Sequence, residues 1–563
     1  MNASQLLKIE DLHVSFSTRN GLVQAVRGIS LQLDVGETLG IVGESGSGKS
    51  VTAFAVTHLL EAAGRITAGK ITYKGQDITY ANWKTLRSVH GAAISMIFQN
   101  PRAALNPIRT VGLQIADAIR VHSHITMAEA RVRALELLYD VMIREPEKRL
   151  DAYPHELSGG MCQRIMIAMA VASEPDLLIA DEPTTGLDVT TQKTVMDLLG
   201  SITAKRGMAT ILITHDLGLA AKYCGRVTVM ERGQIVEDAP PKQLFSTPSH
   251  PYTKRLVAAS PTLTSTISDL VAGSVQEEPP VSFKPSVRLQ PNSQILLAVN
   301  QLSKHYPGSI NAVSNVSFTM RSGESLGLVG ESGSGKSTIA RMLCRLIDAS
   351  QGEIVFDGIA VGSIAARDFH KSALRKDIQI VFQDPHDSLN PRFSAFDCIA
   401  HPLCRLMGMK SGELLTNAVN ECALRVGLPL DLLERFPHQL SGGQKARIGI
   451  ARAIACKPRL LVLDEPTASL DVSVQAVILQ LLDRLRREEG LAFLFVSHDL
   501  NVVRMMCERT IVLHNGEIIE EGLSCDIFSS PQSDYTRALI AAIPHFEPDT
   551  PQISLAELII ETA

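Results

Sequence analysis

The chain contains no apolar run long enough to cross a membrane by itself. A membrane-spanning helix needs roughly 18 consecutive apolar residues. The segment 165–172 is among the longest apolar runs and is typical of a buried helix face. Lys8, Glu10 and Asp11 interrupt the apolar residues near the N-terminus, which is unlike a secretory signal. We therefore expect a cytoplasmic protein whose role at a membrane, if it has one, depends on a partner.

Aromatic residues and an excess of basic charge are also scarce. Aromatic residues make up 4% of the chain, with a single Trp, and 54 Lys and Arg face 59 Asp and Glu. Base stacking and a basic surface are the usual marks of nucleic-acid binding, so we expect no nucleic-acid partner. With 45% hydrophobic and 20% charged residues, the 563-residue chain is globular and long enough for several domains.

The cysteines lack any paired spacing. Nine are dispersed singly, without a C-x-x-C pair and without one between positions 225 and 343. A dispersed, odd number favours reduced, mostly buried thiols over disulfides or a cysteine metal site.

One eight-residue motif occurs twice in identical form. Each copy fits G-x-x-x-x-G-K-[ST], in which backbone N–H groups and a lysine bind phosphate and a hydroxyl reaches Mg²⁺. Each follows an apolar strand pattern, at residues 38–42 and 325–329, and precedes a helix pattern. The predicted phosphate-binding residues are Gly43, Glu44, Ser45, Gly46, Ser47, Gly48, Lys49 and Ser50, and Gly330, Glu331, Ser332, Gly333, Ser334, Gly335, Lys336 and Ser337.

Four further motifs follow each phosphate loop in the same order. They are a glutamine after a strand, a Leu-Ser-Gly-Gly turn before a helix, an Asp-Glu pair after a strand, and a histidine after the next strand. The residues are Gln99, Ser158–Met161, Asp181, Glu182 and His215 in the first half, and Gln383, Ser441–Gln444, Asp464, Glu465 and His498 in the second.

The spacing of the two sets indicates an internal duplication. Lys49 and Lys336 are 287 positions apart, and Asp181 and Asp464 are 283 apart. Apolar strands alternate with helical segments in both halves, which predicts an α/β unit around a mainly parallel sheet. The alternation of apolar and polar residues at 13–16 and 29–33 predicts strands before the first loop. Residues 70–75 are predicted to form an edge strand and a turn, and residues 100–157 are predicted to be helical. Residues 262–294 are rich in Ser, Thr, Pro and Gln and fit a loose linker.

These five motifs, in this order and in duplicate, resemble the ATP-binding-cassette (ABC) ATPase family. The resemblance implies two tandem P-loop domains, each with a RecA-like, mainly parallel sheet core, an antiparallel β subdomain and an α-helical subdomain. It also implies that the domains pair head to tail around two ATP molecules. One site would join residues 43–50 with Ser441, Gly442, Gly443 and Gln444, and the other would join 330–337 with Ser158, Gly159, Gly160 and Met161.

Phosphoryl transfer to water needs charge neutralisation and in-line positioning, which assigns a role to each motif. The two lysines would hold the β- and γ-phosphates. The expected Mg²⁺ ligands are Ser50, Gln99, Asp181, Ser337, Gln383 and Asp464. The expected catalytic residues are Glu182 and Glu465, which orient or deprotonate the attacking water, with His215 and His498 beside the γ-phosphate and Gln99 and Gln383 near the water or Mg²⁺.

Three positions leave alternatives open. Phe16 and Tyr306 lie upstream of the two phosphate loops, where an aromatic ring could stack on adenine or could equally be part of a strand core. Met161 departs from the glutamine expected at its position, and methionine cannot make the same hydrogen bonds. We expect both sites to be competent with some asymmetry.

Two further segments resemble a particular branch of the family. Residues 98–107 and 382–391, together with Pro248–Thr253 and Pro531–Thr536, are similar to the oligopeptide, dipeptide and nickel importer ATPases, in the fused form of glutathione and microcin-type peptide importers. This implies a peripheral protein at the cytoplasmic face of the bacterial inner membrane. Its partners would be two transmembrane permease subunits and, indirectly, a solute-binding protein. Peptides are the first expected solute, with glutathione, opines and nickel chelates as alternatives.

The expected domains are an ATPase domain at 1–261, a linker at 262–294, a second ATPase domain at 295–543 and a tail at 544–563. The competing class is a tandem cassette that acts on ribosomes or DNA. Members of that class carry a longer charged linker or zinc-binding cysteines, and this sequence has neither.

Overall fold

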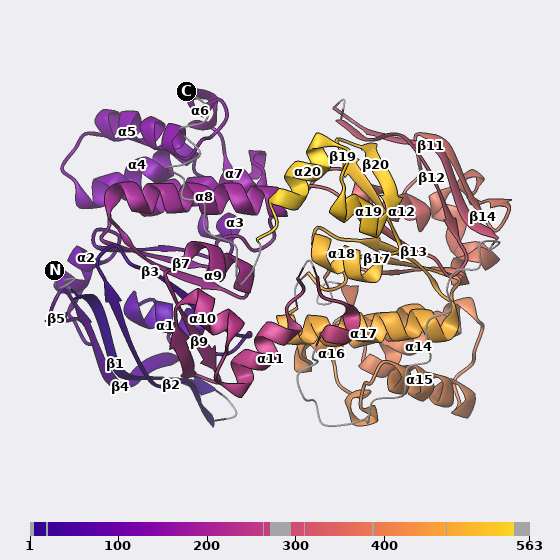
Figure 1. The fold of residues 1–563 in the computed structure, drawn as a ribbon, viewed down its shortest axis with the longest axis horizontal. Helices are drawn as coiled ribbons and strands as arrows, with labels where there is room; N and C mark the ends of the chain where they lie inside the picture. The colour runs from indigo at the N-terminus through magenta and orange to yellow at the C-terminus, as the bar shows by residue number, and fades with distance from the viewer. Residues whose placement is uncertain are drawn as a thin grey trace. The chain divides into compact units, whose positions relative to one another are not determined.

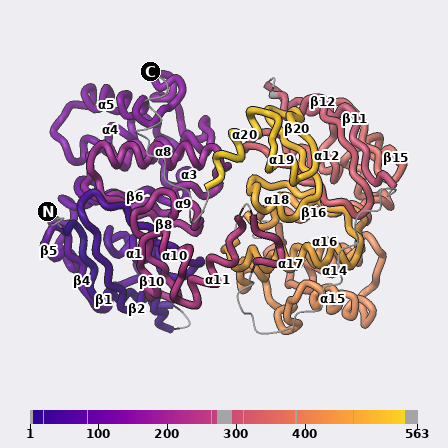
Figure 2. The backbone as a smooth tube through the Cα atoms, in the orientation of Figure 1, coloured from indigo at the N-terminus to yellow at the C-terminus, as the bar shows by residue number. Residues whose placement is uncertain are grey.

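The computed structural model describes residues 5–18, 21–262, 264–270, 294–308, 310–384, 388–468 and 470–544. They form two compact units. The first contains residues up to 187, residues 191–257 and Pro544, and the second contains residues 188–190 and 258–543. Each unit contains one four-stranded and one six-stranded sheet. Figure 1 shows the units as a ribbon and Figure 2 as a continuous backbone. The domain boundaries given above stay a prediction.

The first unit begins with an antiparallel sheet in the order β2-β1-β4-β5. Its strands are β1 (Gln5–Thr18), β2 (Gly21–Asp34), β4 (Gly64–Tyr73) and β5 (Gln76–Asp77). The alternation predicted for residues 29–33 is confirmed, because Ile29, Leu31 and Leu33 are buried while the residues between them are exposed.

The edge position expected for residues 70–73 is wrong for Thr72 and Tyr73. They belong to β4, which pairs with β1 on one side and β5 on the other. Lys74 and Gly75 both have positive φ, 47° and 79°, and connect β4 to the two-residue strand β5 in a tight hairpin. Two residues are too short to show a strand periodicity, so the sequence pattern could not reveal the additional strand.

The second sheet of this unit holds the predicted motifs. It has the order β10-β9-β3-β8-β7-β6, with five parallel strands and β10 antiparallel to β9. The strands are β3 (Thr38–Val42), β6 (Ile94–Ile97), β7 (Leu177–Asp181), β8 (Ala209–Thr214), β9 (Arg226–Glu231) and β10 (Gln234–Ala239). Every residue of β6, β7 and β8 is buried, as is typical of a parallel sheet covered on both faces.

Helices surround this sheet, and those expected between residues 100 and 157 are confirmed. They are α1 (Lys49–Val56), α2 (Trp83–Val89), α3 (Pro101–Ala104), α4 (Val111–His122), α5 (Met127–Asp140), α6 (Pro146–Arg149), α7 (Gly159–Val171), α8 (Val189–Arg206), α9 (Leu217–Tyr223), α10 (Pro241–Ser246) and α11 (Pro251–Ala259). Helix α7 contacts α3, α4, α5 and β6. In Figure 1, α4 and α5 lie at the opposite end of this unit from strands β1, β2 and β4.

The second unit repeats both sheets, in the orders β12-β11-β14-β15 and β16-β17-β18-β13-β19-β20. Its strands are β11 (Ile295–Tyr306), β12 (Ile310–Arg321), β13 (Ser325–Val329), β14 (Gln351–Phe356), β15 (Ile359–Ala360), β16 (Ile378–Val381), β17 (Leu460–Asp464), β18 (Ala492–Val496), β19 (Arg509–His514) and β20 (Glu517–Leu523). Its helices are α12 (Lys336–Leu343), α14 (Ala395–Leu406), α15 (Glu413–Arg425), α16 (Gly442–Ile454), α17 (Val472–Glu489), α18 (Leu500–Met506), α19 (Ser524–Ser529) and α20 (Asp534–Ala541).

The core of each unit joins its two sheets. In the first unit, Leu33 of β2, Leu39 of β3 and Ile179 of β7 belong to one buried cluster. In the second, Phe318 of β12 and Phe356 of β14 cluster with Leu328 of β13. Burial of an apolar side chain of this size contributes about 1.5–3 kcal/mol. The sheet that carries the motifs is therefore held rigidly by apolar packing.

Part of the predicted linker is ordered against the second unit. Residues Ile267–Asp269 form a 3₁₀ turn that contacts α17. Gln480 of α17 donates a hydrogen bond to the Leu270 carbonyl at 2.5 Å. The described beginning of this stretch therefore differs from the loose chain that its composition predicts, and residues 271–293 lie outside the described residues.

No helix in the described part of the chain combines the length and apolar character that crossing a membrane requires.

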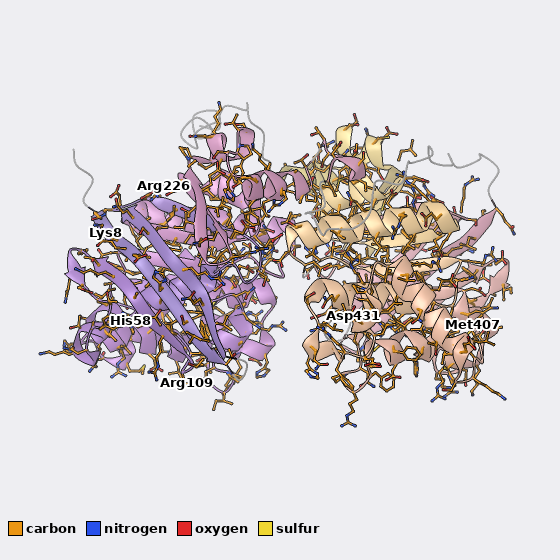
Figure 3. All side chains as sticks on the ribbon, turned by 90° about the horizontal axis from the view of Figure 1, so that it is seen from below. Lys8, His58, Arg109, Arg226, Met407 and Asp431 are labelled. Atoms are coloured by element: carbon orange, nitrogen blue, oxygen red, sulfur yellow. The ribbon has the colours of Figure 1, made fainter. Side chains whose placement is uncertain are left out.

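Polar side chains link strands of the first unit to each other and to neighbouring turns. Arg226, labelled in Figure 3, donates hydrogen bonds to Glu37 and Asp238, both at 2.8 Å, and so ties β9 to β10 and to the turn before β3.

A carboxylate anchors the segment after each six-stranded sheet. Glu237 of β10 accepts hydrogen bonds from the Ser249 N–H at 2.8 Å, the Ser249 hydroxyl at 2.7 Å and the His250 N–H at 3.0 Å. Glu520 of β20 accepts in the same way from Gln532 N–H at 2.8 Å and Ser533 N–H at 3.1 Å. Partial burial would raise the pKa of Glu237, but the donors at Ser249 and His250 outweigh it and lower this pKa to about 2.

Replacing Glu237 with Gln should destabilise the first unit by about 1 kcal/mol at pH 7, because the charged acceptor of these hydrogen bonds is lost. A lowered pKa in the folded state stabilises the fold above the ordinary carboxyl pKa and loses that effect as pH falls toward about 2. The stability difference between wild type and Glu237→Gln should therefore shrink below about pH 5. Urea unfolding at pH 7 and pH 4 measures it, with Glu136→Gln on exposed α5 as control. A difference that does not change with pH would contradict this assignment.

Candidate nucleotide-binding and catalytic sites

Each predicted phosphate loop packs closely against the end of a neighbouring strand. Gly43 has a φ of 150°, and a Cβ atom there would lie 2.2 Å from the Met230 carbonyl oxygen of β9. Gly330 has a φ of 147° and would place a Cβ 2.1 Å from the Leu513 carbonyl oxygen of β19. Only glycine fits this approach, and helices α1 and α12 begin directly after the loops, at Lys49 and Lys336.

Each predicted phosphate-binding lysine donates hydrogen bonds to backbone carbonyl oxygens of its own loop. The Lys49 ammonium donates to the carbonyl oxygens of Gly43 at 2.7 Å and Glu44 at 2.8 Å. Lys336 donates to Gly330 at 2.8 Å and Glu331 at 2.7 Å. Burial lowers the pKa of Lys336. An ammonium group held in this way is desolvated and placed beside N–H groups at a helix start, an arrangement that suits a phosphate.

The hydroxyl and carboxylate predicted to bind magnesium lie together in both units. Ser50 donates to an Asp181 oxygen at 3.0 Å, and Ser337 donates to an Asp464 oxygen at 3.1 Å. Burial raises the pKa of Asp181 to about 6 and raises that of Asp464 too, so neither negative charge is well compensated. Oxygen donors from two elements around an uncompensated carboxylate fit Mg²⁺. Among the described residues, no group of three or more His, Cys, Asp and Glu side chains is placed to hold a metal, so a site here would depend on the serine hydroxyl as well.

The predicted catalytic glutamate of each unit is held in an uncommon backbone conformation. Glu182 and Glu465 have φ values of 47° and 49°. Their N–H groups donate to the carbonyls of Ile213 and Val496, both at 2.9 Å, on the adjacent strands β8 and β18. A non-glycine residue with positive φ persists only where the surroundings hold it, and such residues concentrate at functional sites.

The predicted catalytic side chains of the first unit converge on Glu182. One of its oxygens accepts from Gln99 at 2.6 Å and from Thr185 at 2.9 Å, and the other lies 3.3 Å from Nδ1 of His215. Burial by itself would raise the pKa of Glu182, but the His215 and Thr185 contacts lower it to about 2. The same pairing raises the pKa of His215 against the effect of its burial.

The second unit repeats this arrangement with one donor fewer. Glu465 accepts from Gln383 at 2.7 Å and lies 3.1 Å from Nδ1 of His498. The contact with His498 lowers the pKa of Glu465 although burial opposes it. Ala468 stands where the first unit has Thr185. The motif pattern missed Thr185, and only a comparison of the two halves, position by position, could have found it.

The two Ser-Gly-Gly turns differ in how they begin their helices. Ser158 caps α7 and Ser441 caps α16, each accepting an N–H bond at 3.3 Å from Met161 or Gln444. The Gln444 side chain also accepts from the Ser441 N–H at 2.9 Å, which completes a capping box. Met161 carries only a weak thioether acceptor, and no capping box forms at the start of α7. The residue that departs from the family pattern therefore changes the cap of its own helix.

The two candidate aromatic residues lie near the ends of the first strands of their antiparallel sheets. Phe16 of β1 packs partly buried against the unit core, with its ring against Gly64. Tyr306 of β11 is 38% exposed, and the Lys304 ammonium lies 5.2 Å from its ring centroid. Their proposed contact with adenine stays a prediction.

Sequence reasoning assigned no role to Tyr252 and Tyr535, which the structure places at the phosphate loops. The Tyr252 hydroxyl accepts a hydrogen bond from the Glu44 N–H at 3.1 Å, and the Tyr535 hydroxyl accepts one from the Glu331 N–H at 3.2 Å. The repeated Tyr-Thr pair was visible in the sequence, but no local pattern indicated its distant contact.

Comparison with known families agrees with these motifs. The model described as ABC transporter matches residues 26–185 and 313–468. The model described as oligopeptide/dipeptide transporter, C-terminal region, matches residues 236–282 and 519–559. These matches confirm the family and the α/β fold expected from the motifs.

Individual proteins are similar over nearly the whole chain. The chain is 44% identical over 550 residues to the peptidoglycan transport ATP-binding protein YejF of Agrobacterium fabrum, with 97% of this chain and 98% of that protein covered. It is 42% identical over 574 residues to the glutathione import ATP-binding protein GsiA of Escherichia coli K12, with 97% and 91% covered. The solved dimeric, post-hydrolysis structure of the ATP-binding cassette MJ0796 with ADP and Pi is 25% identical, covers 42% of this chain and 99% of its own, and gives a TM-score of 0.39.

Both halves thus carry the ATPase motifs and both are followed by the same additional region. The chain belongs to the ABC transporter family, as an ATPase with two ATP-binding units that each continue into an oligopeptide/dipeptide transporter C-terminal region.

Proposed function

We propose that this chain is the ATP-hydrolysing subunit of a bacterial ABC importer that takes up peptides. The observation that carries the proposal is the oligopeptide/dipeptide transporter C-terminal region after each of the two ATPase units. Relatives named for glutathione import and peptidoglycan transport support the same class of solute. Di- and oligopeptides are the proposed cargo, with glutathione, opines and nickel chelates as alternatives within the same importer class.

We propose the following roles for the residues of the first site, with their counterparts in the second. Lys49 leaves the loop carbonyls that it contacts and binds the β- and γ-phosphates. Ser50 and Asp181 hold Mg²⁺, with Gln99 at the same ion or at the attacking water. A bound Mg²⁺ would supply positive charge to the triphosphate oxygens.

Glu182 is proposed to orient the attacking water. In the described arrangement its pKa of about 2 makes it a weak proton acceptor, because His215, Thr185 and Gln99 all donate toward it. Movement of His215 toward a γ-phosphate would remove one of these contacts and raise the pKa of Glu182. The histidine would thereby link nucleotide binding to the strength of the base.

The two units are proposed to pair head to tail, so that Ser441–Gln444 completes the site at 43–50 and Ser158–Met161 completes the site at 330–337. The family resemblance supports this pairing. Each half also carries the proposed catalytic glutamate, as Glu182 and as Glu465, which supports two competent sites. ATP binding would close the pair and hydrolysis would open it. A ligand moves such an equilibrium by its different affinity for the two states.

The helical segments predicted at 100–157 and 385–440 are proposed to bind two permease subunits, although residues 385–387 lie outside the described residues. Each presents large apolar side chains to solvent, with Ile108 82% exposed and Leu414 81% exposed. Met407, labelled in Figure 3, adds to the exposed apolar residues of the second segment. The chain would then work at the cytoplasmic face of the inner membrane, with a solute-binding protein on the other side.

Replacing both Glu182 and Glu465 with Gln should reduce ATP hydrolysis by about 10² to 10⁴-fold, because neither site could orient its water. ATP binding should remain, and peptide uptake should stop. Phosphate release and equilibrium ATP binding measure the two effects. Glu517→Gln, at an exposed position of β20, is the matched control and should hydrolyse ATP as the wild type does. Undiminished hydrolysis by the double variant would refute the assigned role.

Membrane association should depend on the permeases. After co-expression with its two permease subunits, the chain should sediment with membranes, and without them it should not. Ile108→Asp together with Leu414→Asp should abolish sedimentation while ATP hydrolysis in solution stays within about twofold, because charge at these exposed positions opposes an apolar interface without altering the core. Leu22→Asp, on the exposed part of β2, is the control. Sedimentation with ribosomes would favour the competing class.

A further inference from the structure

The C-terminal region of each unit extends to its own phosphate loop. Tyr252 lies in the matched region 236–282 and Tyr535 in 519–559, whereas the ATPase family matches end at 185 and 468. Along the chain, the contact between Glu44 and Tyr252 spans 208 positions, and that between Glu331 and Tyr535 spans 204. The contact is therefore a tertiary one that occurs independently in both units.

The hydrogen bond acts on one particular peptide group. The N–H of Glu44 and the C=O of Gly43 belong to the same planar peptide. The Tyr252 hydroxyl holds the N–H side at 3.1 Å, and the Lys49 ammonium holds the C=O side at 2.7 Å. The peptide between Gly330 and Glu331 is held in the same way, by Tyr535 at 3.2 Å and by Lys336 at 2.8 Å. Rotation of this peptide would break both bonds at once.

Each tyrosine is itself fixed before it reaches the loop. The carboxylates of Glu237 and Glu520 anchor the turns that precede α11 and α20, so the helix starts that carry the tyrosines are held. Tyr252 is 5% exposed. Burial raises the pKa of Tyr535 to about 12, so its hydroxyl stays protonated at neutral pH.

The two rings are supported by different neighbours. The Arg255 guanidinium lies 5.8 Å from the Tyr252 ring centroid and 3.6 Å from Glu231, the last residue of β9. The Tyr535 ring stacks on His514, the last residue of β19, with centroids 4.1 Å apart. The same hydroxyl contact is thus reached with an ion pair in one unit and a stacked histidine in the other. What the units share is the hydroxyl on the loop peptide.

We propose that Tyr252 and Tyr535 are positioning residues for nucleotide binding, whose hydroxyls hold the first peptide of each phosphate loop so that the backbone of the loop is preorganised for phosphate. The inference rests on the proposed assignment of residues 43–50 and 330–337 as the phosphate loops. The segment typical of peptide importers then sets the nucleotide affinity of the ATPase to which it is attached. Preorganisation strengthens binding because less ordering remains to be done when the ligand arrives.

Tyr252→Phe and Tyr535→Phe test this by removing one oxygen from each ring. Each is made in a full-length chain in which the other site is disabled, Tyr252→Phe with Lys336→Ala and Tyr535→Phe with Lys49→Ala. Titration calorimetry with ADP and Mg²⁺ should show binding about three- to tenfold weaker than in the parent, the loss of one hydrogen bond. With both lysines intact, the Tyr252→Phe, Tyr535→Phe double variant should show a raised KM for ATP and a kcat within about twofold of wild type.

Hydrogen exchange of the nucleotide-free chain provides the second measurement. Amide exchange of the peptide that contains residues 43–46 should become about tenfold faster in Tyr252→Phe, because the Glu44 N–H loses its acceptor. Tyr73→Phe is the matched control, since it removes a tyrosine hydroxyl bonded to Asp176 in the same unit, away from the loop. It should change neither exchange of residues 43–46 nor ADP binding.

The outcomes separate this inference from the assignment of the loops. Unchanged exchange and unchanged ADP affinity in the Tyr→Phe variants would overturn the inference. A lower kcat with an unaltered KM would overturn it as well, since the hydroxyl would then act after binding. If the parent chains bind no ADP, the loop assignment fails, and the exchange measurement still decides whether the tyrosines restrain the loops.

Discussion

The close approach of a glycine to a strand-end carbonyl is the constraint on which each site depends. A Cβ at Gly43 or Gly330 would lie 2.2 Å or 2.1 Å from the carbonyl oxygen beneath it. Because the loop packs this tightly, the lysine that begins the next helix reaches the loop carbonyls, and the adjacent serine reaches the aspartate at the end of a parallel strand. The arrangement of the groups proposed to bind phosphate and metal thus depends on this backbone contact.

Two neighbouring carboxylates in each site experience opposite electrostatic environments. Asp181 is buried with a single hydroxyl donor and its pKa is raised to about 6, whereas Glu182 is surrounded by donors and its pKa is lowered to about 2. The difference arises from hydrogen bonding, since both side chains are desolvated. An uncompensated carboxylate suits a cation, and a carboxylate held by several hydrogen-bond donors suits the positioning of a water, which matches the two roles proposed for this pair.

The duplication preserves the main contacts and changes their support. Glu182 has Thr185 as an additional donor where the second unit has Ala468, and Gln444 completes a capping box that Met161 cannot. The ring of Tyr252 lies beside Arg255, which pairs with Glu231, whereas the ring of Tyr535 stacks on His514. Each unit therefore retains the main contacts among its proposed site residues, while several of the residues that support them differ.

The sequence by itself determined the family, the duplication, the order of the motifs and the strands that present them. Glycine turns, helix caps and apolar runs depend on residues that are close together in the sequence, so the sequence alone can reveal them. Tertiary structure alone decided that Tyr252 contacts the backbone at Glu44, that Thr185 contacts Glu182 and that Thr72 and Tyr73 lie between two strands of their sheet. Such contacts depend on how segments far apart in the sequence pack against each other. The periodicity of apolar residues within one segment does not predict that packing.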